Sequence, residues 1–156
     1  MKDKKIRILC IVAAALSVLA VVPIMFEFYN FYSTDVLGYQ YDYFVYGFEL
    51  YSDTNMWWFI LVGVLGIISL LWNLVYGAYA IIDGRYRNLT WRIARYGYFY
   101  GIVIGIINFA MIMSLVCNSA PAAWAFLVII AATVAIETVL VISKDEETKN
   151  KLSENN

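Results

Sequence analysis

Four long apolar runs, separated by shorter polar segments, organise the sequence. The runs cover residues 8–26, 56–82, 96–116 and 122–142, and Glu137 is the one charged residue inside them. Uninterrupted apolar runs of about 18 residues or more are typical of helices that cross a lipid bilayer. Because lipid offers the backbone no hydrogen-bond partners, each spanning segment is expected to be an α-helix. The pattern predicts an all-α fold, an integral membrane four-helix bundle.

The first apolar run admits two interpretations, a cleaved signal peptide or a retained helix. It follows a basic N-terminus, as a signal peptide does. However, the run has about 19 residues, longer than the ~7–15 of a signal core. It also ends in aromatic residues that are typical of a membrane interface rather than of a cleavage site. We therefore expect a retained first helix and a four-helix transmembrane domain over residues 1–143.

The distribution of charge predicts the orientation. All 11 Lys and Arg lie before the first run, in a basic loop at 83–95, or in the polar tail at 144–156. Loops rich in Lys and Arg stay on the cytoplasmic side. We therefore expect a multi-pass protein of the cell membrane with both termini in the cytoplasm and an unstructured tail. The loop arginines either set the topology alone or also bind anionic lipid headgroups, each contributing about 1 kcal/mol; they are Arg85, Arg87, Arg92 and Arg95.

The outer loop at 27–55 contains no Lys or Arg and is rich in tyrosine. Tyr39, Tyr41 and Tyr43 alternate with polar residues, and alternation with a period of two favours a strand. Two interpretations remain open for this loop. One is a short β-hairpin on the outer surface, and the other is an irregular aromatic loop in the headgroup region.

Small residues spaced by four mark two faces where helices can approach closely. One face, in the third run, carries Gly97, Gly101 and Gly105. The other, in the second run, carries Gly66 and the residues Ser69, Asn73 and Gly77, which are also four apart. Small residues at such spacing are enriched at helix–helix contacts in membranes. We predict that these two faces pack against each other.

Each of the four runs has a polar side chain at a similar depth. Ser17, Asn73, Asn108 and Thr133 lie 10–13 residues from the nearest charge at the inner end. At about 1.5 Å per residue, this places them about 15–20 Å from those charges, near the bilayer midplane. The pattern favours a buried layer of hydrogen bonds that joins the helices. The alternative is a substrate or ion site at that level.

Glu137 is the one ionisable group inside an apolar run. A carboxyl group there costs roughly 1–3 kcal/mol, so it should face protein or water rather than lipid. An ionisable group within a membrane is a candidate functional residue. The alternative is a structural role, because Glu137 lies only about 10 Å along the helix from Lys144 and can reach toward the inner headgroups.

The composition excludes several classes of function. The chain is 63% hydrophobic and 15% charged, has no histidine, and has two distant cysteines. No nucleophile–base pair, metal-ligand cluster or cofactor motif is recognisable, so we expect no enzyme, no metal, no cofactor and no nucleic-acid partner. The prediction is a non-catalytic interaction, assembly or accessory protein whose partners are the lipid bilayer and a membrane protein or a second copy. The alternative is a small oligomeric channel or transporter that uses Glu137 and the midplane polar layer.

Overall fold

The structure is a computed structural model that describes residues 2–34, 37–38, 40–52, 57–82, 88–114 and 120–154. The elements are α1 (Lys2–Leu19), α2 (Val21–Ile24), β1 (Glu27–Thr34), β2 (Gln40–Tyr46), α3 (Gly47–Leu50), α4 (Trp57–Ile82), α5 (Asn88–Met113) and α6 (Pro121–Glu154). The described part is mostly helical, and its four long helices are long and apolar enough to cross a membrane, as predicted.

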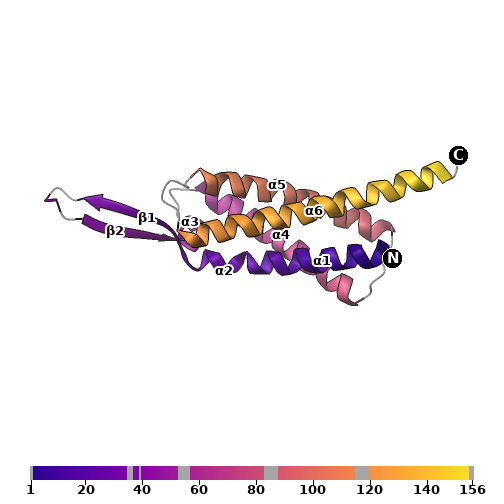
Figure 1. Cartoon of the computed structure of the whole chain (residues 1–156), viewed down its shortest axis with the longest axis horizontal. Coiled ribbons are helices and arrows are strands. Elements are labelled where there is room, and N and C mark those ends of the chain that lie inside the picture. The colour runs from indigo at the N-terminus through magenta and orange to yellow at the C-terminus, as the bar shows by residue number, and fades with distance from the viewer. Residues whose placement is uncertain are drawn as a thin grey trace.

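The four long helices run alternately up and down and pack as a bundle (Figure 1). Each contacts its neighbours in chain order, and the ring closes where α1 meets α6. The two ends of the chain lie at one end of the bundle, and β1 and β2 project from the other end (Figure 1). In a bundle whose helices run alternately up and down, helices that follow one another in the chain are antiparallel and are usually joined by short loops.

The core consists of two hydrophobic clusters along the bundle. The cluster nearer the strands joins β1, α3, α4, α5 and α6; its buried residues are Phe28, Tyr29, Leu50, Phe59, Ile112, Ala123, Phe126, Leu127 and Ile130. The cluster nearer the chain ends joins all four long helices; its buried residues are Cys10, Ala13, Tyr76, Ala80, Ala94, Tyr98 and Leu140. The outward faces of the same helices are also apolar, so the bundle is hydrophobic inside and outside.

The first helix differs from the prediction of one helix at 8–26. In the structure α1 ends at Leu19, a turn follows at Ala20, and α2 continues to Ile24. The cause is Pro23, which has no N–H to donate and whose ring crowds the carbonyl four residues earlier, that of Leu19. The short helix α2 packs mainly against α6.

The predicted third and fourth spans lie close to the apolar spans Ile93–Met113 and Pro121–Ser143, but the helices extend beyond them. We expected helices at about 96–116 and 122–142, but α5 begins at Asn88 and α6 continues to Glu154. Residues 88–95 of the predicted basic loop and most of the predicted polar tail are therefore helical. Hydropathy marks the apolar part of a helix and not its ends, and no glycine or proline after Pro121 would end α6 at 142.

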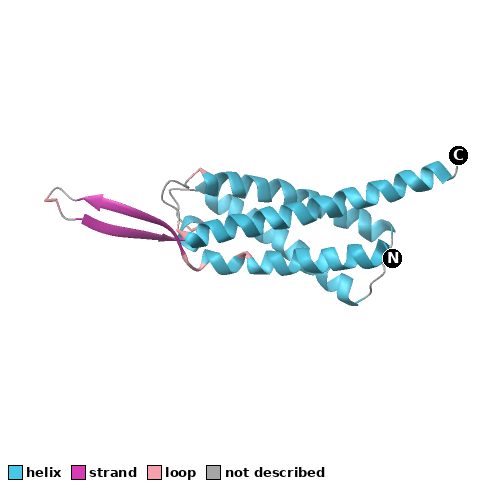
Figure 2. Ribbon diagram, viewed as in Figure 1, coloured by secondary structure: helices cyan, strands magenta, loops and turns pink. Residues whose placement is uncertain are grey.

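β1 and β2 form a two-stranded antiparallel ribbon, with Thr34 paired to Gln40 at its tip (Figure 2). Gly38, between the strands, has a φ of 85°, which glycine adopts without steric cost. At the base, the pairing shifts register between Glu27 and Tyr29.

The two small-residue faces do not pack against each other, contrary to the prediction. A Cβ atom on Gly77 of α4 would overlap the Ala14 side chain of α1. On α5, a Cβ atom on Gly97 would overlap the indole ring of Trp72. Gly77 therefore accommodates α1, and Gly97 accommodates a large side chain of α4 rather than its small-residue face.

The other two glycines of α5 face α6. A Cβ atom on Gly101 would lie 2.6 Å from Oε1 of Glu137, and one on Gly105 would overlap the Val134 side chain. Ser69 of α4 instead lines a cavity between the helices. The spacing of small residues identified faces that admit a neighbour, but it carried no information on which neighbour fills each face.

Candidate functional site

A cavity of about 380 Å³ lies between the helices in the half of the bundle nearer the ribbon. Its walls come from α1, α2, α3, α4, α5 and α6 and are mostly apolar. Gly66 on α4 leaves part of this space open, since a Cβ atom there would meet only the Asn108 amide at 3.9 Å.

The cavity reaches the surface of the bundle between α2 and α4. Val21 on α2 and Val64 and Ile67 on α4 all line the cavity, yet they are 39%, 51% and 59% exposed. At this level α2 packs mainly on α6. The exposed lining residues of α2 and α4 place an entrance on the apolar side of the bundle.

The end of the cavity deepest in the bundle is polar. Asn73 of α4 donates from Nδ2 to Oγ of Ser17 on α1 at 2.7 Å and to Oε1 of Glu137 on α6 at 2.8 Å. Ser17 in turn donates to the carbonyl of Ala13 at 2.9 Å. Asn73, Ser17 and Glu137 are 2%, 7% and 1% exposed, so little surface of this three-helix network is exposed.

The carboxyl group of Glu137 is packed against the backbone of Gly101, where any larger residue would displace it. No Lys or Arg is present among the described residues that line the cavity. A buried carboxylate is stable only if it is paired or well hydrogen-bonded. Within the described part of the chain, Glu137 accepts one hydrogen bond from a neutral amide and has no cationic neighbour in the cavity wall.

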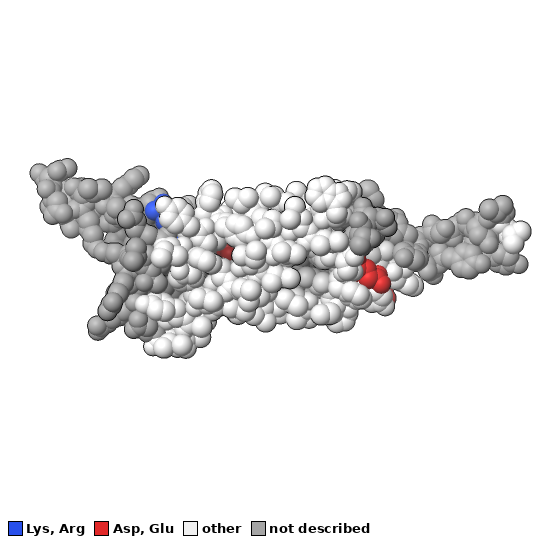
Figure 3. Space-filling view, turned by 180° about the vertical axis from the view of Figure 1, so that it is seen from behind, with Lys and Arg blue, Asp and Glu red and all other residues white. Residues whose placement is uncertain are grey.

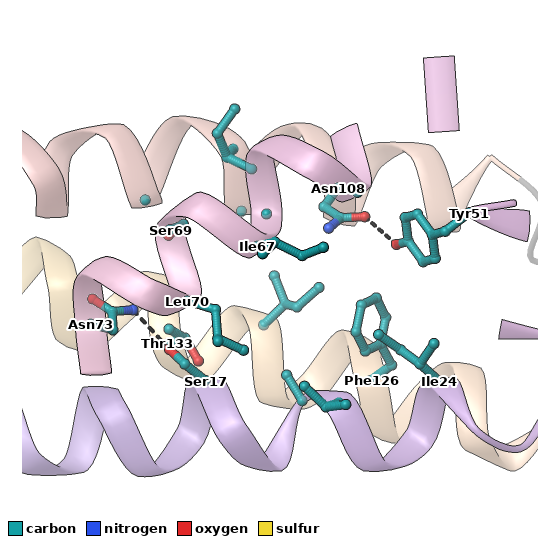
Figure 4. Close-up of a pocket in the computed structure, with 18 of the residues that line it drawn as sticks. Ser17, Ile24, Tyr51, Ile67, Ser69, Leu70, Asn73, Asn108, Phe126 and Thr133 are labelled. Atoms are coloured by element: carbon teal, nitrogen blue, oxygen red, sulfur yellow. Dashed lines mark hydrogen bonds between the residues drawn. The ribbon is translucent and has the colours of Figure 1, made fainter. Parts of the chain in front are cut away.

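The other end of the cavity, near the ribbon, carries a second polar pair. The hydroxyl of Tyr51 donates to Oδ1 of Asn108 on α5. Burial raises the pKa of Tyr51 above its ordinary value, so the phenol keeps its proton and acts as the donor. Figure 4 shows the two pairs, Ser17 with Asn73 and Tyr51 with Asn108, at opposite ends of the cavity.

The structure thus separates the residues that the sequence placed in one midplane layer. Ser17 and Asn73 join each other and Glu137, whereas Asn108 pairs with Tyr51 at a different level. Thr133 lines the cavity, but its hydroxyl donates to the carbonyl of Ile129 in its own helix. Tyr51 was not among the predicted site residues because nothing in the sequence shows that its loop folds back onto the bundle.

Among the predicted headgroup residues, Arg95 is partly exposed near the start of α5. Arg85 and Arg87 lie outside the described residues, as does the side chain of Arg92. Arg7 was not among the predicted site residues, and its Nη2 donates to the carbonyl of Ile81 at 2.8 Å. This contact satisfies one of the free carbonyls at the end of α4 and places a cation at the negative end of that helix.

Comparison of the chain with protein-family models, with curated proteins and with solved structures found no match. The fold and the site define a bundle of four helices with an apolar exterior, a lateral cavity and a projecting ribbon. Inference of function starts from these three features.

Proposed function

We propose that the protein is a multi-pass protein of the cell membrane, with both termini in the cytoplasm, and that it acts as a non-catalytic interaction or accessory protein. The apolar exterior supports the membrane placement. Large side chains such as Val75, Phe99 and Val128 are 63%, 60% and 66% exposed on three different helices. An apolar surface of this extent is unfavourable in water but matches the hydrocarbon core of a bilayer.

The charges at the two ends of the bundle support the orientation. The described Lys and Arg side chains, Lys4, Lys5, Arg7 and Arg95, belong to the starts of α1 and α5, at the end where the chain begins and ends. Among the described side chains, the acidic Glu27 and Glu49 belong to β1 and α3 at the ribbon end. On the face shown in Figure 3, the described surface between the two ends is almost entirely uncharged. Placing the basic end in the cytoplasm satisfies the positive-inside rule and puts the ribbon outside the cell.

The observation that carries the interaction role is a ribbon that projects beyond the bundle from a firmly packed base (Figure 1). Phe28 and Tyr29 of β1 are fully buried in the bundle core. The hydroxyl of Tyr29 donates to the carbonyl of Ile112 on α5 at 3.0 Å, and the amide of Ala120 donates to the carbonyl of Phe28 at 2.7 Å. Gly47 completes the base, because a Cβ atom there would come within 2.8 Å of the Ile24 backbone.

Above this base the ribbon offers both backbone edges and apolar side chains. In a two-stranded sheet each strand has one edge without a neighbouring strand, and such an edge can pair with a strand of a partner. Phe44 on β2 is 42% exposed, and Leu37 at the turn is 80% exposed. A firmly packed base and exposed apolar side chains on the ribbon are the features expected of a surface that binds the outer part of a membrane protein.

Site-specific photocrosslinking tests this role. A photoreactive amino acid replaces Phe44 on the ribbon or, as a control, Val75 on the lipid-facing side of α4. After irradiation of intact cells, the Phe44 position should give a discrete adduct with one protein, and the Val75 position should not. Equal yields of diffuse adducts at the two positions, or none at Phe44, would contradict the interaction role.

Accessibility to a membrane-impermeant maleimide tests the orientation separately. In a Cys117→Ser background, the remaining Cys10 is fully buried, so single cysteines can be introduced at Phe44 and at Lys4. The reagent should label Phe44→Cys in intact cells and Lys4→Cys only after the cells are opened. The reverse pattern would invert the topology.

A second function, a small oligomeric channel or transporter, is favoured by one observation. Glu137 lies at the polar end of a cavity that is open on the side of the bundle. If this function is correct, vesicles containing the protein should show an ion or proton flux that Glu137→Gln abolishes. Absence of flux with the unaltered protein removes this alternative and leaves the interaction role intact.

A further inference from the structure

We propose that the lateral cavity is a binding site for a lipophilic organic cation, held by the carboxyl group of Glu137. This inference goes beyond the interaction role and rests only on the membrane placement proposed above. It starts from the charge of the cavity. Glu137 is 1% exposed, and its partner in the network, Asn73, is neutral.

Charge complementarity selects a cationic ligand. The described residues that line the cavity include no Lys or Arg. A positive charge that pairs with Glu137 in the cavity must therefore come from a ligand or from a part of the chain that the structure does not describe. In a medium of low dielectric constant, an ion pair is far stronger than in water, and an unpaired charge is far more costly. A neutral lipid chain in the same space would leave the carboxyl group with its single amide partner.

The described residues of the cavity wall do not offer the ligand set of calcium or magnesium. Calcium and magnesium require about six or more oxygen ligands, or retained waters, at close range. Next to Glu137 the cavity instead presents the amide nitrogen of Asn73, a donor, and the bare backbone of Gly101. The remaining walls are mostly apolar, so they favour a cation whose charge is covered by carbon.

Aromatic side chains complete the match at the other end. Phe48, Tyr51 and Phe126 line the cavity on the ribbon side, and Tyr51 and Phe126 lie near each other there (Figure 4). Aromatic faces attract organic cations, most strongly when water is excluded. The volume of about 380 Å³ falls within the range of roughly 300–1,000 Å³ typical of small-molecule sites.

The position of the opening fits a ligand that arrives through the lipid. The entrance between α2 and α4 is bordered by Val21, Val64 and Ile67, all exposed on the apolar face of the bundle. A lipophilic cation concentrates in the membrane and can enter sideways without passing a polar end of the protein. A hydrophilic cation would have to cross the same apolar entrance at the cost of its hydration.

Equilibrium binding of labelled tetraphenylphosphonium to the full chain in lipid nanodiscs tests the proposal. Tetraphenylborate, which has the same shape and the opposite charge, is the matched control ligand. The unaltered protein should bind the phosphonium saturably and with one site, and should not bind the borate saturably. Glu137→Gln keeps an oxygen that accepts from Asn73 but loses the charge, so it should weaken phosphonium binding at least about tenfold.

Two further variants separate the site from general effects. Glu27→Gln removes one negative charge at the start of β1, away from the cavity, and should leave binding unchanged. Gly66→Val adds side-chain volume to the cavity wall, where a Cβ atom meets only the Asn108 amide at 3.9 Å, and should weaken binding while Glu137 is intact.

Three results would overturn the proposal: no saturable phosphonium binding to the unaltered protein, equal binding to Glu137→Gln, or equal binding of the borate. None of these results would affect the interaction role, which is tested by crosslinking at Phe44. Conversely, loss of the Phe44 adduct would leave the cation site standing.

Discussion

Replacement of Asn73 by leucine is the most direct test of how the bundle is held together at its middle. The side chain of Asn73 joins three helices, because its amide donates to Ser17 on α1 and to Glu137 on α6. Leucine has the same number of side-chain heavy atoms and the same branch at Cγ, so Asn73→Leu removes both hydrogen bonds without leaving an empty space. Both former acceptors then remain buried, at 7% and 1% exposure.

The expected loss follows from the number of bonds. In membrane proteins, a hydrogen bond between helices contributes on average about 0.6 kcal/mol and at most about 1.7 kcal/mol. Two bonds therefore correspond to a loss of roughly 1–3.5 kcal/mol in the free energy of unfolding. The value should fall in the upper half of this range, since the carboxyl group of Glu137 loses its described partner in a buried position.

Unfolding of the purified protein in mixed micelles by increasing SDS, followed by tryptophan fluorescence, measures this loss. Thr133→Val is the matched control. Thr133 lines the same cavity, but its hydroxyl bonds within its own helix, so the change should cost less than about 0.5 kcal/mol. A double-mutant cycle of Asn73→Leu with Ser17→Ala should give a coupling energy of about 0.6 kcal/mol or more.

Unfolding of Asn73→Leu at the same or a higher SDS fraction than the unaltered protein would refute a stabilising role of Asn73. Simple addition of the effects of Asn73→Leu and Ser17→Ala would also refute it, because the two side chains then do not stabilise each other. In either case the bundle is held by packing alone, and the polar end of the cavity has no structural role.

Three further predictions concern the base of the ribbon and the glycine contacts. Tyr29→Phe leaves the Ile112 carbonyl without its donor and should cost about 1–3 kcal/mol, measured by the same SDS titration; an unchanged midpoint would contradict the contact. Burial raises the pKa of Tyr29 to about 12 from an unfolded value of 10.0, so its contribution to stability is fully present below pH 10 and is lost as the pH rises through 12. The stability difference between the unaltered protein and Tyr29→Phe should therefore shrink over this window, and a constant difference would refute the shift. Gly97→Ala should destabilise the bundle by about 1–3 kcal/mol because the added methyl group overlaps Trp72, whereas Gly66→Ala has room and should be neutral or stabilising; equal effects would disprove the close contact.

The sequence alone determined the number of long helices and their apolar character, since both depend on local composition. It did not determine where these helices end. Hydropathy changes at the edge of an apolar run, but a helix continues as long as no residue breaks it, so α5 begins at Asn88 and α6 continues to Glu154. The break near the end of the first helix was readable in principle, because Pro23 restricts the backbone locally.

Only the tertiary structure decided which side chains meet. Spacing along one helix shows that Gly77 and Gly101 leave room for a neighbour, but not that the neighbours are α1 and Glu137. Equal depth likewise suggested one polar layer, whereas rotation about each helix axis brings Asn73 to Glu137 and leaves Asn108 with Tyr51. Depth is a property of one chain segment, but the rotation and the lateral opening depend on how all the helices pack together, and no single segment encodes them.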